Sequence, residues 1–234
     1  MFKQSLLATA LLAVALSASA FAAPPSAGNK SRAAQKAAAL TQAPSGAQLS
    51  PGLAAHYYRD HDFWDGIWPD TVPVPVAVSA NYTFTNYRYT RVEPVINHLF
   101  TMHGWVSVRW KGYLTIPAAE DPNRAFNYTF LLLADDGCRL FIDGQKLTDD
   151  WRPCAENSRG AVRTATMALT PGPHALVVEY FNGQSLGAED YDPCKLSWKC
   201  AERSLEAQAI PDAQFSHTEE DLTATAGRLD SAAP

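Results

Sequence analysis

The chain has 234 residues, of which 47% are hydrophobic, 11% aromatic and 18% charged. This composition is sufficient for one sizeable folded core and excludes a wholly disordered or low-complexity chain. The formal net charge of -5 argues against a protein that binds nucleic acid. The four cysteines suit either two disulfides or one metal site, and the compartment in which the protein works decides between them.

The N-terminus has the layout of a secretory signal. Lys3 precedes a short apolar run at residues 6–16, and small residues around Ala20 and Ala22 suit cleavage. A membrane-spanning helix needs roughly 20 apolar residues, which is more than this run provides. We therefore expect residues 1–22 to be removed, and the mature protein to be exported to the periplasm, the cell surface or the medium without a transmembrane segment.

Composition divides the remainder of the chain into three parts. Residues 23–50 are rich in Ala, Gly, Pro and Ser and lack aromatic residues, which is typical of a linker. Aromatic residues begin directly after this linker, and residues 51–200 are expected to form the folded domain. Within it, residues 72–103 look like an insertion that extends a rim around a binding site or covers a sheet. Residues 201–234 are polar and are expected to form a tail.

Short stretches of β-branched and aromatic residues, separated by Gly, Pro, Asn and Asp, dominate the expected domain. The clearest predicted strands are residues 105–114, 127–133, 139–143, 161–169, 174–181 and 195–198. Asp143 and Gly144 predict a tight hairpin turn, and residues 170–173 predict a second reversal. Helical periodicity is scarce, so the sequence predicts an all-β fold, an antiparallel β-sandwich.

Asp135 and Asp136 follow a strongly apolar predicted strand and precede a glycine, so both carboxylates are expected to project from a strand end. Adjacent acids there suit a hard cation, although acids in turns commonly face solvent or cap nearby amides. Calcium takes six to eight oxygen ligands, so a second loop must contribute. The loop at residues 182–193 is rich in oxygen ligands: Asn182, Gln184, Glu189, Asp190 and Asp192.

The chain resembles the protective-antigen fourteen-kilodalton domain family, a lectin-like β-sandwich found in toxins, adhesins, glycosidases and bacterial surface proteins. The matching residues are 52–53, 57–58, 108–114, 134–137, 139–144, 150–151, 171–172, 179–181 and 196–198. They occur in the order typical of the family. The most specific piece is Asp135-Asp136-Gly137, followed by a hydrophobic strand and the Asp143-Gly144 turn.

The resemblance implies carbohydrate binding through calcium. In sugar-binding members, paired aspartates joined by a cis peptide hold a calcium ion that contacts two sugar hydroxyls, and Asp135 and Asp136 match that pair. Asn182 and Gln184 are the nearest candidates for the residues that complete the site from the later loop. With Asp190 and Asp192 they make up the expected metal ligands, and Gln184 and Glu189 are expected sugar contacts.

Two tryptophans before the insertion are further candidates for sugar binding. Trp64 and Trp68 carry aromatic rings that can stack on the apolar side of a pyranose. The alternative is that both rings pack near the N-terminal strand. We keep both interpretations.

Disulfides are the expected state of the cysteines in an exported chain. The predicted hairpin brings Cys138 near Cys154, which favours a bridge between them. Cys194 and Cys200 lie six residues apart, about 20 Å along a continuous strand, too far for a local bridge. The pairing of the four residues therefore stays open. A zinc site is the competing interpretation, but the spacings contain no close Cys-x-x-Cys pair.

Together these features predict an exported, calcium-dependent carbohydrate-binding module whose partner is a glycan or glycoconjugate. The alternative is a structural or assembly module of the cell envelope that contacts another envelope or surface protein. A glycan hydrolase would need two facing carboxylates at a fixed separation, which sequence does not reveal. No catalytic residue is assigned.

Overall fold

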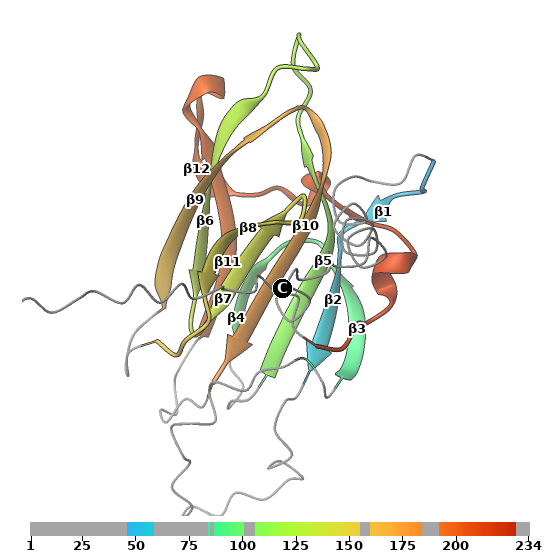
Figure 1. Ribbon diagram of the computed structural model, residues 1–234, viewed down its shortest axis with the longest axis vertical. Helices are drawn as coiled ribbons and strands as arrows, with labels where there is room; N and C mark the ends of the chain where they lie inside the picture. The colour runs from blue at the N-terminus through green and yellow to red at the C-terminus, as the bar shows by residue number, and fades with distance from the viewer. Residues whose placement is uncertain are drawn as a thin grey trace, which may run out of the picture.

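The computed structural model describes residues 46–58, 84, 87–100, 106–154, 160–183 and 192–227. The predicted signal and nearly all of the predicted linker lie outside these residues, as do Trp64 and Trp68. The described chain forms two antiparallel sheets that pack face to face (Figure 1). None of its short helical turns has the length and apolar character needed to cross a membrane. The all-β sandwich predicted from the sequence is confirmed.

The larger sheet, sheet A, has eight strands in the described part of the chain. They are β1 (Ser50–Pro51), β2 (Leu53–Tyr58), β3 (Tyr87–Glu93), β5 (Val106–Ile116), β7 (Cys138–Ile142), β8 (Gln145–Asp150), β10 (Gly172–Asn182) and β13 (Phe215–His217). The main order is β1-β13-β5-β10-β7-β8, and β2 pairs with both β3 and β5. The long β5–β10 pairing, from Gly172 opposite Ile116 to Asn182 opposite Val106, forms its centre.

The smaller sheet, sheet B, has five strands among the described residues. They are β4 (Asn97–Phe100), β6 (Phe126–Ala134), β9 (Ala161–Leu169), β11 (Asp192–Cys200) and β12 (Leu205–Ala209). The order is β12-β11-β6-β9, and β4 also pairs with β11. Three single-turn 3₁₀ helices complete the described elements: η2 (Ala201–Arg203), η3 (Asp212–Gln214) and η4 (Glu220–Leu222).

The core lies between the two sheets and follows from strand alternation. Along β6, every second residue from Phe126 to Ala134 is buried, which is the period expected when one face of a strand packs inward. Trp110 of sheet A and Trp198 of sheet B are almost fully buried in this core. Large aromatic rings on both facing surfaces therefore hold the layers together.

The strands predicted from the sequence are confirmed, with ends that differ by a few residues. Asp143 and Gly144 form the predicted turn between β7 and β8, and both adopt positive φ angles, 49° and 75°. Such angles suit a tight hairpin, and glycine adopts them without a steric penalty. The reversal at residues 170–173 differs from a hairpin because β9 belongs to sheet B and β10 to sheet A. It carries the chain from one layer to the other.

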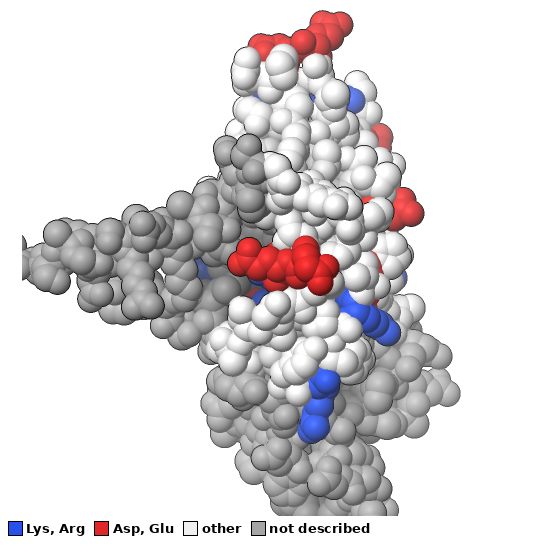
Figure 2. Space-filling view, turned by 90° about the vertical axis from the view of Figure 1, so that its right-hand side faces the viewer, with Lys and Arg blue, Asp and Glu red and all other residues white. Residues whose placement is uncertain are grey.

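The expected insertion supplies edge strands instead of one continuous cover. Its described part contains β3, which pairs with β2 at the edge of sheet A, and β4, which pairs with β11 in sheet B. Figure 2 shows the side of the molecule that carries β1 to β3, with acidic side chains across its middle and basic side chains below them. The described residues drawn on this face form no extended basic patch of the kind that nucleic acid binding requires.

The region after Cys200, expected to be a polar tail, differs most from the prediction. It contributes β12 to sheet B and β13 to sheet A. Two isolated apolar side chains in this polar stretch, Ile210 and Phe215, are each 2% exposed. Because they are single residues, they give no periodic pattern, although their burial fixes the segment on the sandwich. The folded unit therefore extends beyond residue 200.

Residues 218–227, here called the C-terminal segment, lie against the outer face of sheet A. Arg109 of β5 donates from Nη1 to the carbonyl of Thr225 at 2.7 Å and from Nη2 to the carbonyl of Gly227 at 2.6 Å. β10 is buried on both faces from Val177 to Asn182, and on this side Arg109 binds Glu179 while Trp151 packs against Phe181. A sheet face that sequence alone would expose to solvent is thus part of the interior.

Beneath this cover lies a buried ionic network. Glu179 is fully buried and accepts from Arg109 Nε at 2.9 Å and from Arg139 Nη1 at 3.2 Å. Arg139 also donates to Asp149 at 2.7 Å, and Asp149 lies at the half-exposed end of the network. Buried charges are tolerated only when they are paired and hydrogen-bonded, and here each has a partner.

Candidate metal centre

The paired aspartates lie in the short turn that leads from β6 in sheet B to β7 in sheet A. The peptide bond between Asp135 and Asp136 is cis, as the family resemblance implied. The turn is tied to both layers by main-chain bonds. Asp135 N donates to the carbonyl of Pro193 at 2.9 Å, and Asp136 N donates to the carbonyl of Phe181 at 3.1 Å. Tyr180 donates its hydroxyl to the carbonyl of Asp135 at 2.6 Å.

The carboxylate of Asp136 is held by main-chain donors from two other loops. Cys154 N lies 2.7 Å from Oδ1, and Gly183 N lies 2.7 Å from Oδ2. Burial raises the pKa of Asp136 above its usual value, and the neighbouring Asp135 carboxylate also raises it, whereas these two N–H bonds oppose the rise. The site thus concentrates negative charge that a bound cation would neutralise.

Three ligand atoms converge at this turn. One carboxylate oxygen each from Asp135 and Asp136 and the Sγ of Cys154 all lie within 4.8 Å of one another. In the described part of the chain, this is the group of His, Cys, Asp and Glu side chains with the spacing of metal ligands. The two carboxylates fit a hard divalent cation such as calcium, whereas sulfur is a ligand for softer metals. Further oxygen ligands for calcium must come from elsewhere.

The expected ligands of the later loop divide into two groups. Asn182 and Asp192 border that loop, are 2% and 7% exposed, and bind each other through Asn182 Nδ2 and Asp192 Oδ2 at 2.6 Å. Asp192 is not one of the three residues that converge at the aspartate turn. Gln184, Glu189 and Asp190 lie outside the described residues. The structure thus brings the start of the loop to Asp136 through Gly183, the neighbour of Asn182.

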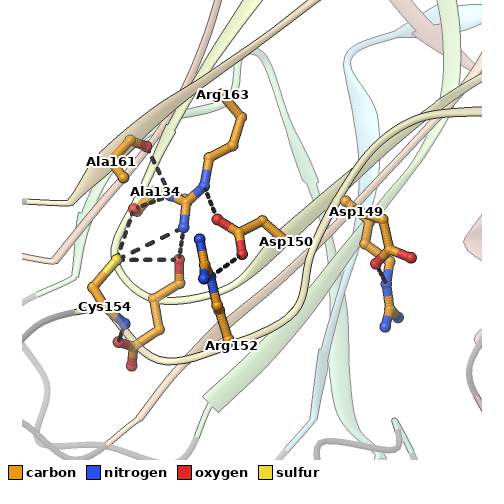
Figure 3. Close-up of polar contacts among 9 residues, drawn as sticks. Ala134, Asp149, Asp150, Arg152, Cys154, Ala161 and Arg163 are labelled. Carbon is orange, nitrogen blue, oxygen red and sulfur yellow. Dashed lines mark hydrogen bonds and ion pairs between the residues drawn. The ribbon is translucent and has the colours of Figure 1, made fainter.

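Arg163 is the residue of this site that the sequence analysis missed. Its guanidinium spreads toward the aspartate turn, as Figure 3 shows, and donates to the carbonyl of Ala134 at 2.6 Å and to that of Asp136 at 3.3 Å. Its Nε donates to Asp150 at 2.9 Å. One sequence signal existed, because Arg163 is the single charged residue of β9.

The cysteines differ from the disulfides expected for them. None of the four is bridged in the structure, including the pair Cys138 and Cys154. The Sγ of Cys154 instead lies 3.7 Å from the carbonyl of Ala134 and 3.8 Å from that of Asp136, so this side chain contacts the aspartate turn. Cys138 and Cys194 are buried thiols, and burial raises the pKa of Cys138 to about 12.

Gly137, the third residue of the Asp-Asp-Gly motif, allows the turn to lie close to β10. A Cβ atom built on Gly137 would overlap the ring of Phe181. Phe181 N in turn donates to the carbonyl of Gly137 at 3.0 Å. Trp151 packs against the same ring with centroids 4.7 Å apart. The glycine is therefore required for close packing next to the acidic pair.

Known proteins share this fold over part of their length. An anti-sigma-I factor, RsgI3, from Acetivibrio thermocellus is 26% identical over 149 residues, which is 58% of this chain and 20% of that protein. An anti-sigma factor domain-containing protein from Clostridium clariflavum is similar in structure, with a TM-score of 0.50 and 22% identity over 73% of this chain and 48% of that one. The chain thus spans less than half of either relative.

A third similar structure is a subtype-switched epithelial adhesin 9 A domain from Candida glabrata, determined in complex with beta-lactose. Its TM-score is 0.52 and its identity 12%, over 78% of this chain and 96% of that one. At this identity the likeness concerns the fold alone. Residues 101–208 match the family model of the PA14 domain, a span that includes the aspartate turn and strands of both sheets. Over these residues the chain is similar to the PA14 domain family, as its sequence predicted.

Proposed function

We propose that this chain is an exported, calcium-dependent carbohydrate-binding module that recognises glycans at a cell surface or in the extracellular medium. The observation that carries the proposal is the pair Asp135 and Asp136, two adjacent carboxylates held at one end of the sandwich where three loops meet. Because burial and mutual repulsion raise the pKa of Asp136, a cation between the carboxylates would lower the free energy of the site.

Asp135 and Asp136 would hold the ion, and Asn182 with Gln184, Asp190 and Asp192 are the proposed sources of further oxygen ligands. A bound calcium ion supplies open coordination positions for two neighbouring sugar hydroxyls. The chain's own contribution is orientation, because the N–H groups of Cys154 and Gly183 fix the plane of the Asp136 carboxylate. Glu189, Trp64 and Trp68 remain proposed sugar contacts.

Two further observations support the proposal. The adhesin domain with the same fold was crystallised with beta-lactose, so this architecture can present a sugar site. The N-terminal 22 residues have the pattern of a cleaved signal, which suits a protein that meets glycans outside the cytoplasm. Sugar specificity would depend on the loop that follows Gly183.

Calorimetry tests the metal site directly. Wild type is expected to bind calcium, and Asp136→Asn is expected to lose the heat of binding because one ligand charge is removed. Glu120→Gln is the matched control, since Glu120 is an exposed acid in the turn between β5 and β6. A glycan array with calcium and with a chelator then tests sugar binding. Equal heats for wild type and Asp136→Asn would contradict the calcium site.

The second candidate is a structural or assembly module of the cell envelope. The observation that favours it is the match to one part of an anti-sigma-I factor, a longer protein of which this chain spans 20%. The module would then contact another envelope protein, and its aspartate turn would have a structural role. A chelator-insensitive complex on pull-down, with no signal on the glycan array, would support this candidate over the first.

A further inference from the structure

We propose that Arg163 is a positioning residue for the metal centre: its guanidinium holds the backbone of the Asp135–Asp136 turn and thereby aims both carboxylates at one point. The inference rests on the proposed function for the identity of the ion. The arrangement of the turn that Arg163 would set does not depend on a bound ion. Arg163 binds the turn through the main-chain carbonyls of Ala134 and Asp136 and binds Asp150 outside it.

The guanidinium contacts both sides of the turn. Nη1 donates to the carbonyl of Ala134 at 2.6 Å, immediately before the pair, and Nη2 donates to the carbonyl of Asp136 at 3.3 Å, at its end. The residue between these two carbonyls is Asp135. Because Arg163 binds main-chain atoms on both sides of Asp135, it fixes the course of the turn. Figure 3 shows these contacts converging on one side chain.

Arg163 also connects the turn to the loop after β8. Its Nε donates to Asp150 Oδ2 at 2.9 Å, and Nη2 lies 3.7 Å from the Sγ of Cys154. Cys154 is the residue whose N–H binds Asp136 Oδ1. A single guanidinium on a strand of sheet B therefore locates both the aspartate turn and one of the donors that orient its carboxylate.

The chemistry of this position requires an arginine. The side chain of Arg163 is 10% exposed, and its fork serves two turn carbonyls, the carbonyl of Ala161 and a carboxylate at the same time. An ammonium group is a point charge with three donors and cannot reproduce this planar spread.

The first experiment measures how well the aspartate turn is ordered in the absence of metal. Amide hydrogen exchange is recorded in chelator for wild type, Arg163→Gln, Arg163→Lys and Arg152→Gln. Arg152 is the matched control because it binds the other oxygen of Asp150 at 2.6 Å but is 79% exposed. In Arg163→Gln we expect faster exchange at the amides of Cys154 and Gly183, and no change at Leu196, whose amide bonds to Ile96 in sheet B.

Calcium calorimetry on the same proteins is the second measurement. Arg163→Gln is expected to weaken calcium binding about 10- to 100-fold, the usual cost of losing a residue that supports metal ligands. Arg163→Lys is expected to recover only part of the loss, and Arg152→Gln to bind as wild type does. If Arg163→Gln fails to fold, Asp150→Asn is used in its place. That change removes the carboxylate that binds Arg163 Nε and leaves the guanidinium itself.

Each result decides the proposal. Wild-type exchange at Cys154 and Gly183 in the Arg163→Gln protein would overturn it, whether or not calcium binds. Full recovery by Arg163→Lys would also overturn it, because charge alone would then suffice. If wild type gives no heat with calcium, the proposed function fails, while the exchange measurement still decides whether Arg163 positions the turn.

Discussion

Gly183 donates its backbone N–H to Oδ2 of Asp136 across 2.7 Å, although 47 residues separate the two in the chain. This bond joins the loop that follows β10 to the turn that follows β6. Since Cys154 binds the other oxygen of the same carboxylate, main-chain groups from two loops orient Asp136.

Calcium is expected to raise the melting temperature of wild type and to leave that of Asp136→Asn unchanged. A ligand that binds only the folded state stabilises it, by about 2.7 kcal/mol at a concentration 100 times its dissociation constant. Thermal unfolding with calcium and with chelator measures the effect. Glu120→Gln should respond as wild type does, and a shift of equal size in Asp136→Asn would place the bound ion elsewhere.

Gly137→Ala is expected to destabilise the fold by roughly 1–3 kcal/mol, because the added methyl group would overlap the ring of Phe181. Urea unfolding measures the loss. The double variant Gly137→Ala with Phe181→Leu should lose less than the sum of the two single variants, since the smaller side chain leaves room for the methyl group. Simple additivity would show that the two residues do not press on each other.

Glu179→Gln is expected to cost about 3–5 kcal/mol, because it leaves the guanidinium groups of Arg109 and Arg139 without their buried carboxylate. Asp149→Asn is the matched control at the half-exposed end of the same network and should cost no more than about 1 kcal/mol. Chemical unfolding of both variants gives the comparison. Similar losses would mean that burial of the network is unimportant for its strength.

Mild acid is expected to destabilise the protein through His56. Burial lowers the pKa of His56 from 6.5 to about 4, so the folded protein keeps this imidazole neutral while the unfolded chain takes up a proton. Stability from this group is complete above pH 6.5 and is lost as the pH falls toward 4, by roughly 3 kcal/mol in total.

His56 binds the carbonyl of Asp221, so the same acidification should loosen the C-terminal segment. Unfolding measured at both ends of this pH window checks the prediction. His56→Gln is the control, because it keeps a donor and an acceptor but does not titrate. A pH dependence in His56→Gln as steep as that of wild type would assign the effect to other groups.

The sequence was sufficient for the features that repeat or that carry a distinctive motif. The strand-like content of residues 127–133 predicted β6, and the Asp143-Gly144 pair predicted the turn after β7, since both signals are local. Asp135 and Asp136 were found as a candidate site because two adjacent acids after an apolar strand are unusual. The resemblance to the PA14 family implied their cis peptide, which the structure contains.

The features that were missed depend on contacts between distant segments. Arg163 reaches the aspartate turn from β9, and nothing in its local sequence indicates the carbonyl groups that it binds. Cys154 was expected to form a disulfide, because spacing suggests which cysteines are near each other but not where their thiols point. The region after residue 200 looked like a tail because Ile210 and Phe215 are isolated among polar residues.

The pairing of β1 with β13 has a mechanical consequence. Ser50 lies opposite His217, so the chain enters the folded unit and returns to its edge at the same place. A force that pulls Ser50 and His217 apart acts at the end of the antiparallel β1–β13 pair. The hydrogen bonds between the two strands then break one after another, starting at that end. The Asp135–Asp136 turn joins β6 to β7, away from this pairing, so we expect the β1–β13 edge to open under load while the sandwich around the acidic pair stays intact.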